Sequence, residues 1–156
     1  WEDFDHENRL HNLRNTLERL LELGAIPIIN ENDPIACEEY SLGDNDTLAA
    51  LVGECIHADL VVLLSDIEGL YTADPHTHPE AKLLHHVAGI DDHIREIAGI
   101  SSSAQGTGGM VTKLHAAEIC LGCGCKMVIA NGNNPGNLYD ILEGKAVGTT
   151  FSEERL

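Results

Sequence analysis

The sequence predicts an α/β protein with an open, mainly parallel sheet and helices on both faces. Segments with helical and with strand-like spacing alternate in the order αβ–αβ–α–αβ–αβ, which is typical of this class. The run Asp59–Ser65 (DLVVLLS) is almost continuously apolar, as expected for a central strand buried on both faces. The 156 residues, 43% of them hydrophobic, suit one domain with a core of its own.

The first half of the chain is expected to supply two helix–strand units. Leucines at helical spacing predict a helix over Glu7–Leu23, and Gly24 is placed to end it. The apolar segment Ala25–Asn30 (AIPIIN) is expected to form a short buried strand before a polar loop. Asp44–Ile56 begins with acidic and amide residues, which favour helix starts, so a second helix is expected to lead into the strand Asp59–Ser65.

The second half continues the alternation after a turn-rich loop. Residues 75–89 are expected to be irregular, with a hairpin near KLLHHV. The later elements are expected to be a short helix over 91–98, a helix over 109–121, a strand over 126–130, a turn at NGNNPG, a short helix at NLYDILEG and a last strand at AVGTTF. In open α/β sheets ligands bind beyond the carboxyl ends of the strands, here in the loops after Asn30, Ser65 and Ala130.

The charge distribution limits the classes of partner. The formal net charge is −17, which argues against a nucleic-acid partner because phosphate backbones are bound by basic faces. The longest apolar run is too short to span a membrane. Lys113 is the only Lys or Arg between Arg95 and Lys126, so a phosphate bound there would depend on Lys113, backbone N–H groups and a metal ion.

Cysteine usage favours a cytoplasmic protein. The five cysteines are an odd number without framework spacing, and the chain opens on charged residues with no apolar signal segment. We therefore expect reduced thiols and a cytoplasmic location. The cluster CLGCGC resembles a thiolate site, but no nearby pair of ligands completes it, and no metal-ligating residue is predicted.

The segment Gln105–Lys113 (QGTGGMVTK) is a candidate phosphate site. Its glycines allow backbone N–H groups to approach an anion, and the helix that follows offers its positive end. The segment is not a Walker A motif, because Leu114 follows Lys113 where that motif has Ser or Thr. It is not a Rossmann fingerprint either, because no strand directly precedes it. A flexible glycine loop with a surface lysine is the structural alternative for this pattern.

Three further segments gather acidic and amide side chains at predicted strand ends or helix starts. They are INEND (Ile29–Asp33), GDND (Gly43–Asp46) and SDIEGLYTADP (Ser65–Pro75). The first suits an amino-acid-like ligand with ammonium and carboxylate groups, and the second could hold an ammonium or orient a lysine. The third lies at the tip of the predicted central strand. Their structural alternatives are an Asx-rich turn, a helix cap and a β-turn.

Taken together, PIINENDP, GDNDTLAALV, ADLVVLLSDIEGLYTADP and GTGGMVTKLHAAE, in this order, resemble the glutamate 5-kinases of the amino acid kinase family. ANGNNPG and EGKAVGTTF agree near the end, so the resemblance covers about Asn8 to Phe151. It implies an amino acid kinase-like αβα sandwich, with residues 1–156 as the C-terminal portion of that domain and no PUA domain. It also implies ATP-dependent phosphorylation of the γ-carboxylate of L-glutamate to glutamyl 5-phosphate, the first step of proline biosynthesis, with Mg²⁺ bridging the phosphates.

The resemblance assigns roles position by position. Lys113 would stabilise the charge that develops during transfer, and Asp46 would organise the lysines around the transferring group, so these two are the predicted catalytic residues. It further implies a homo-oligomer, with proline as a feedback inhibitor. The predicted binding residues are Asn30, Asp33 and Asn45 for glutamate, Ser65 and Asp66 for the nucleotide, and Thr107, Gly108, Gly109, Met110, Val111, Thr112 and Lys113 for its phosphates.

The family pattern also has an N-terminal strand, a glycine–serine turn and a second phosphate-contacting lysine, which this sequence does not contain. Two alternatives therefore stay open. One is a non-catalytic fragment that binds a nucleotide or an amino acid. The other is a sister kinase that acts on another carboxylate.

Overall fold

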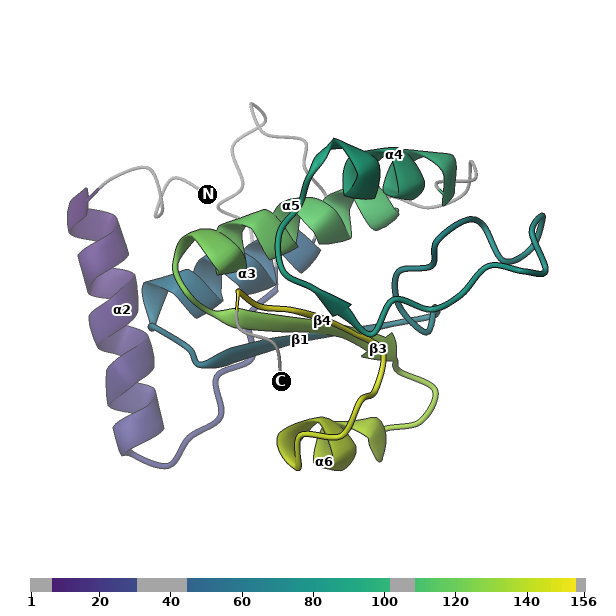
Figure 1. Cartoon of the computed structure of the whole chain (residues 1–156). Helices are drawn as coiled ribbons and strands as arrows, with labels where there is room; N and C mark the ends of the chain where they lie inside the picture. The colour runs from purple at the N-terminus through teal and green to yellow at the C-terminus, as the bar shows by residue number, and fades with distance from the viewer. Residues whose placement is uncertain (1–6, 31–44, 102–108, 154–156) are drawn as a thin grey trace.

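A computed structural model describes residues 7–30, 45–101 and 109–153, which form a sheet with helices on both faces (Figure 1). The helices are α2 (Glu7–Glu22), α3 (Asn45–Cys55), α4 (Asp92–Ser101), α5 (Met110–Gly122) and α6 (Asn137–Leu142), and the strands are β1 (Leu60–Ser65), β2 (His86–Val87), β3 (Lys126–Asn131) and β4 (Thr149–Phe151). In Figure 1, α3, α4 and α5 lie above the sheet and α6 lies below it. The predicted α/β class with helices on both faces is confirmed.

The sheet is mixed, with the strand order β1-β3-β4-β2. β1 and β3 are parallel over six residue pairs, from Leu60 opposite Lys126 to Ser65 opposite Asn131. β4 is antiparallel to β3 and parallel to β2. Two of the three pairings are therefore parallel, which agrees with the predicted mainly parallel sheet.

The inner strands of the described sheet are β3 and β4, and not β1 as predicted. Four consecutive residues of β3, from Met127 to Ala130, are buried. β1 lies at an edge of the described sheet, and its Leu64 side chain is 45% exposed. An apolar run indicates burial on both faces, but the number of neighbouring strands depends on the rest of the sheet.

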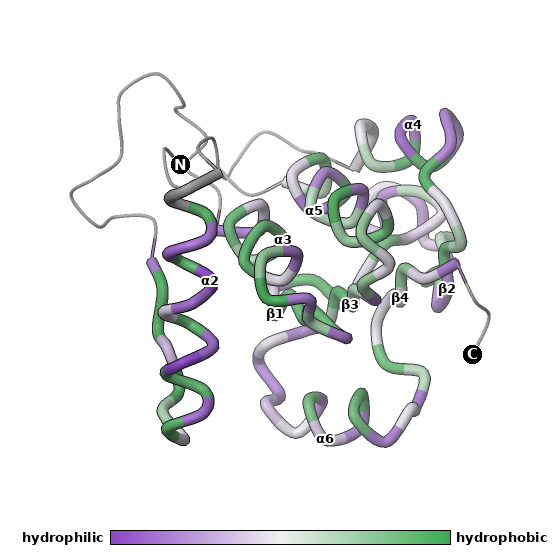
Figure 2. The backbone as a smooth tube through the Cα atoms, turned by 90° about the vertical axis from the view of Figure 1, so that its left-hand side faces the viewer, coloured by the Kyte–Doolittle hydropathy of each residue, from purple (hydrophilic) through white to green (hydrophobic). Residues whose placement is uncertain are grey.

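The core lies between the sheet and the helices α3 and α5. Small residues face the contact, and Ala50, Ala116 and Ala117 are fully buried. A Cβ built on Gly53 would lie 2.6 Å from a methyl of Val61, so the glycine allows α3 to approach β1 closely. Figure 2 shows hydrophobic residues concentrated where these helices face the strands.

The predicted helices agree well with the structure. α2 ends at Glu22, and Gly24, with a φ of +72°, follows as predicted. The Arg14 guanidinium of α2 donates to the Cys55 carbonyl at 2.5 Å, where the C-terminal end of α3 favours a cation. α4 is longer than predicted, and its first turn is capped by Asp91, whose carboxylate accepts from the Ile94 N–H at 2.8 Å.

The predicted strand over Ala25–Asn30 is wrong. Within the described residues this segment pairs with no strand, and the side chains of Ile26 and Ile28 are 88% and 94% exposed. Pro27 also lacks an N–H group for a ladder. Apolar character predicted a strand here, but a strand forms only where a neighbouring strand accepts its hydrogen bonds.

The predicted hairpin within residues 75–89 is present in a reduced form. Tyr71 and Leu83 form an isolated antiparallel bridge, and the Leu84 N–H donates to the Leu70 carbonyl at 2.8 Å. The chain between them projects from one side of the molecule (Figure 1, right). β2 then follows and pairs with β4.

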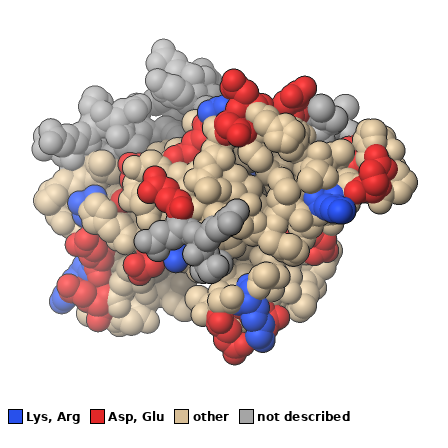
Figure 3. Space-filling model, in the orientation of Figure 1, with Lys and Arg blue, Asp and Glu red and all other residues tan. Residues whose placement is uncertain are grey.

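The described surface carries interspersed charges. On the face shown in Figure 3, a mixed group of acidic and basic side chains lies over α6 at the bottom. Lys145 there contacts Asp140 at 2.6 Å and Glu143 at 2.8 Å, which raises the pKa of Lys145 through hydrogen bonds to both carboxylates. Among the helices of the described ranges, none combines the length and the apolar character needed to cross a membrane.

The entry into β4 should be sensitive to a single methyl group. Gly148 has a φ of +66°, and a Cβ there would lie 2.0 Å from the Ile129 carbonyl oxygen. Gly144 is the matched control, because its φ is +78° but no atom lies within 4 Å of the built Cβ. We expect Gly144→Ala to cost about 1–2 kcal/mol from backbone strain, and Gly148→Ala to cost at least about 2 kcal/mol more. Urea unfolding of both variants measures the difference, and equal losses would contradict this packing.

Candidate functional site

The topology places two helix starts at one edge of the sheet. α3 leads into β1, and α5 leads through a short turn into β3. Because β1 and β3 are parallel and each preceding helix runs back along them, the N-terminal ends of α3 and α5 lie at the carboxyl edge (Figure 1). The structure thus brings the described parts of the GDND and GTGGMVTK segments, residues 45–46 and 109–113, to the edge where Ser65 and Asn131 end their strands.

The two predicted catalytic residues contact each other. The Lys113 ammonium of α5 lies 3.0 Å from a carboxylate oxygen of Asp46 in α3, and the two side chains are only 7% and 19% exposed. The Thr112 hydroxyl lies 2.7 Å from the Gly109 carbonyl and 3.2 Å from the same Asp46 oxygen. Lys113 is therefore a buried residue, which excludes the alternative of a surface lysine.

Placing the positive charge of Lys113 at this position has an electrostatic cost, which a residue with a purely structural role would not need to carry. It is the fourth residue of α5, where the positive end of the helix disfavours a cation and attracts an anion. Burial adds a desolvation cost that the Asp46 carboxylate offsets. An ammonium held in this place can neutralise an anion that binds at the start of α5.

The loop after β1 is anchored at both ends. The Ser65 carbonyl accepts from the Gly132 N–H at 2.8 Å, and the Leu70 N–H donates to the Thr149 hydroxyl at 2.8 Å in a buried contact. Within the loop, the Ser65 hydroxyl donates to the Asp66 carboxylate at 3.1 Å. Ser65 is half-buried and Asp66 is exposed, so Asp66 faces solvent at the carboxyl edge.

The other predicted site residues divide into three groups. Asp33, Thr107 and Gly108 lie outside the described residues. Asn30 and Asn45 are exposed, and no hydrogen bond joins either of them to another predicted site residue within the described ranges. In the first turn of α5, Met110 is buried and Val111 is 55% exposed. The first backbone N–H groups of an α-helix generally lack a partner within the helix ladder.

Two polar side chains at this edge were not predicted as site residues. The Asn131 side-chain amide donates to a Glu68 carboxylate oxygen at 2.8 Å, and this bond joins the loops after β3 and β1. The sequence contains one signal for these two residues. The segment ANG, which contains Asn131, follows an apolar run, and so does SDIEG, which contains Glu68. The contact itself depends on the pairing of β1 with β3.

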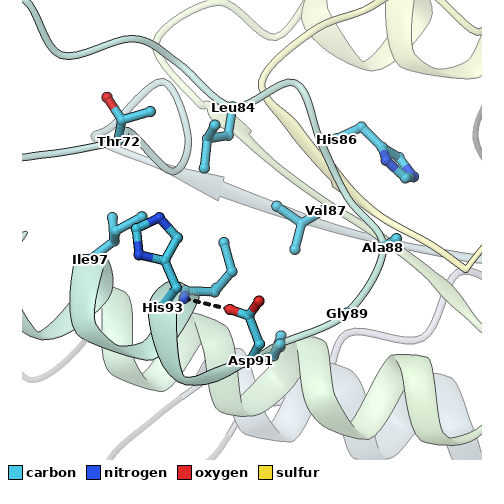
Figure 4. A pocket seen from close by; sticks show the side chains of 11 residues that line it. Thr72, Leu84, His86, Val87, Ala88, Gly89, Asp91, His93 and Ile97 are labelled. Atoms are coloured by element: carbon cyan, nitrogen blue, oxygen red, sulfur yellow. Dashed lines mark hydrogen bonds between the residues drawn. The ribbon is translucent and has the colours of Figure 1, made fainter.

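A cavity of about 730 Å³ lies away from these residues, between α4, β2 and the hairpin. In Figure 4, Leu84, Val87 and Ile97 form apolar walls, and the His93 imidazole lies beside Ile97. The His86 ring points away from these side chains and contacts the Ser152 carbonyl at 3.0 Å. This cavity shares no lining residue with the Lys113–Asp46 pair.

The cysteines near the end of α5 lie in different environments. Cys120 and Cys125 are buried and Cys123 is exposed, and no disulfide joins any of the described cysteines. Burial raises the pKa of the Cys120 thiol to about 12, and burial also raises the pKa of Cys125. The described residues contain no group of three His, Cys, Asp or Glu side chains that could hold a metal ion.

Comparison with known proteins places this arrangement in a family. The family model of the amino acid kinase family matches residues 2–131. The chain belongs to the amino acid kinase family. The predicted family is therefore confirmed, and the Lys113–Asp46 pair lies within the matched range.

The curated relatives of this amino acid kinase chain include several named glutamate 5-kinase. Those of Caldanaerobacter subterraneus subsp. tengcongensis and Serratia marcescens are each 49% identical over 150 and 149 residues, and that of Herpetosiphon aurantiacus is 50% identical over 143 residues. The matches cover 96%, 96% and 92% of this chain but only 40%, 41% and 39% of the relatives. The chain thus spans about two fifths of the length of the curated relatives that it matches.

Solved structures support the fold. The UMP kinase of Bacillus anthracis superposes with a TM-score of 0.62 at 16% identity, over 91% of this chain and 52% of that chain. The isopentenyl phosphate kinase of T. acidophilum superposes with a TM-score of 0.58 at 23% identity, over 88% of this chain and 52% of that chain. At these identities the likeness shows a shared fold.

Substitutions of Lys113 and Asp46 should have strongly non-additive effects on the free energy of unfolding. Asp46→Asn keeps the side-chain volume but removes the charge beside a buried ammonium, so we expect a loss of about 2–4 kcal/mol in the free energy of unfolding. Lys113→Met keeps most of the apolar stem and leaves a carboxylate that is closer to solvent, so its cost should be smaller. In urea unfolding, the double variant should lose about 1–3 kcal/mol less than the sum of the single variants. Additive losses would contradict a direct interaction.

Alkylation should separate the cysteines of this region. Iodoacetamide reacts with thiolates, and the exposed Cys123 should be labelled at least roughly tenfold faster than Cys120 and Cys125 in the folded protein at pH 8. Burial protects both Cys120 and Cys125, and it also raises the pKa of each thiol. Peptide mass mapping over time gives the rates, and the same measurement in urea is the control, because unfolding should remove the difference. Equal rates in the folded protein would contradict the burial.

Proposed function

We propose that this chain is the nucleotide-binding portion of a glutamate 5-kinase. Such an enzyme transfers the γ-phosphoryl group of ATP to the γ-carboxylate of L-glutamate and forms glutamyl 5-phosphate, the first step of proline biosynthesis. The observation that carries the proposal is the buried Lys113 ammonium at the start of α5, held by Asp46. The identity of 49–50% to relatives named glutamate 5-kinase supports the choice of glutamate over another carboxylate.

The residues at the carboxyl edge fit a phosphate ligand that carries a divalent cation. Lys113 and the first-turn N–H groups of α5 offer positive charge to the phosphates. Asp66 supplies a carboxylate at the carboxyl edge of the sheet, and Asp46 supplies another near it. Kinase sites hold Mg²⁺ through one or two carboxylates together with substrate phosphates. Bound Mg·ATP supplies the transferable phosphoryl group.

The residues of this chain act by position and charge. Lys113 stabilises the negative charge that develops on the phosphoryl oxygens, and Asp46 keeps the ammonium aimed at that place. Ser65 and Asp66 contact the nucleotide, and the segment from Thr107 to Lys113 holds its phosphates. Asn30, Asp33 and Asn45 contact glutamate in this proposal.

The proposal extends to the setting of the enzyme. We place it in the cytoplasm, in line with the absence of disulfides among the described cysteines. A homo-oligomer and inhibition by proline at the glutamate site belong to the same proposal and rest on the resemblance to glutamate 5-kinases.

Turnover measurements test the role of Lys113. A coupled ADP-release assay with L-glutamate and Mg·ATP should show activity that Lys113→Ala lowers at least about 100-fold, because the variant removes charge stabilisation of the transition state. Lys126→Ala is the matched control, since Lys126 is exposed at the start of β3, at the opposite edge of the sheet. This variant should keep its activity within about twofold.

Other outcomes of the same assay separate the alternatives. ATP binding without turnover would support a non-catalytic nucleotide-binding fragment. Phosphorylation of another carboxylate, with no response to glutamate, would support a sister kinase and contradict the glutamate assignment. Circular dichroism of each variant verifies that the fold is retained.

A further inference from the structure

We propose that Asn131 and Glu68 are positioning residues for the nucleotide, which hold the loop after β1 in its binding geometry. The inference rests on the proposed function, in which Ser65 and Asp66 of this loop contact the nucleotide. Neither Asn131 nor Glu68 needs to touch the ligand. Their effect passes through the loop between β1 and the hairpin.

Asn131 is placed opposite the beginning of that loop. It is the last residue of β3, and in the parallel pairing it lies opposite Ser65, the last residue of β1. The two strands therefore end together, and the chains that leave them begin side by side. Glu68 lies three residues beyond Ser65, within reach of the Asn131 side chain, and the hydrogen bond between them measures 2.8 Å.

The orientation of the Asn131 amide is fixed by its partners. Its side-chain nitrogen donates to Glu68, and its side-chain oxygen accepts from the Asn133 N–H at 2.8 Å. The Asn131 carbonyl accepts from the Asn137 side chain at 3.0 Å. An amide satisfies these contacts because it donates at one atom and accepts at the other, whereas a carboxylate of the same shape only accepts.

The hydrogen bond between Glu68 and Asn131 holds the loop at a third point, which lies between its two anchored ends. Ser65 is held to Gly132 through the backbone, and Leu70 is held to Thr149. Glu68 is exposed, and a single hydrogen bond between exposed side chains contributes little to overall stability. Its main effect is local, because it fixes the loop two residues after Asp66.

Charge gives a second reason for this bond. Glu68 places a carboxylate in a loop that is proposed to contact an anionic nucleotide, where like charges repel each other. The Asn131 amide directs that carboxylate toward the turn after β3. A weakened bond would release both the loop and its negative charge.

Four variants of nearly unchanged shape test the inference. Asn131→Asp turns the donor into a second carboxylate facing Glu68, and it keeps the acceptor for Asn133. Glu68→Gln keeps an acceptor for Asn131, so its effect alone should be small. In the combined variant a Gln donor faces the new carboxylate, which restores the hydrogen bond with reversed polarity. Asn133→Asp is the matched control, because it adds the same charge in the same turn without contacting Glu68.

The main readout is the dissociation constant for a non-hydrolysable ATP analogue with Mg²⁺, measured by titration calorimetry. We expect Asn131→Asp to weaken binding about tenfold, while Glu68→Gln and Asn133→Asp stay within about twofold and the combined variant recovers to within about threefold. The melting temperatures of the four variants should stay close to one another, because the bond is exposed. Unchanged affinity in Asn131→Asp, no recovery in the combined variant, or an equal loss in Asn133→Asp would each overturn the inference.

Amide hydrogen exchange separates this inference from the proposed function. Exchange in residues 66–69 should accelerate in Asn131→Asp, and it should return to the original rate in the combined variant. If the unmodified chain binds no ATP analogue, the proposed function fails, and the nucleotide role of the two residues fails with it. Accelerated exchange would in that case still support the loop attachment, whereas unchanged exchange would overturn the attachment as well.

Discussion

The Lys113 ammonium is buried between α3 and α5, close to the positive end of α5. Burial and the helix dipole each disfavour a cation at this place. The Asp46 carboxylate offsets that cost, and it can do so only if the first turns of α3 and α5 lie side by side. This requirement links the local chemistry to the architecture. α3 and α5 must precede parallel, adjacent strands, so that their N-terminal ends reach the same edge of the sheet.

Close packing provides the necessary precision. Buried alanines of α3 and α5 belong to the core under these helices, and Gly53 allows α3 to approach β1 within the reach of a Val61 methyl. A similar close approach brings the backbone at Gly148 against the Ile129 carbonyl before β4. Close-packed interiors transmit small displacements, so the distance between Lys113 and Asp46 depends on residues outside the pair.

The carboxyl edge combines two kinds of constraint. Buried charge fixes the start of α5, and a series of hydrogen bonds between neighbouring loops fixes the chain after β1. Phosphoryl transfer depends mainly on positioning and on electrostatic stabilisation, and both need groups that do not reorganise during the reaction. Under the proposed function, the helix starts and strand ends at this edge would supply such groups.

The sequence by itself determined the α/β class, the helices and the family. Leucine spacing, capping residues and glycine stops are local signals, and they located α2, α3 and α5 closely. The ordered motifs also singled out Asp46 and Lys113 as candidates, because acidic residues at one helix start and a glycine-rich segment before another are visible without a fold.

Only the tertiary structure decided which of these residues meet. The contact between Lys113 and Asp46, which lie 67 positions apart, and the bond between Glu68 and Asn131 depend on the pairing of β1 with β3. The same dependence explains the errors, since Ala25–Asn30 has the composition of a strand but no described strand beside it, and β1 reads as a central strand but lies at an edge. Propensity is a property of a short segment, whereas pairing and burial are properties of its neighbours.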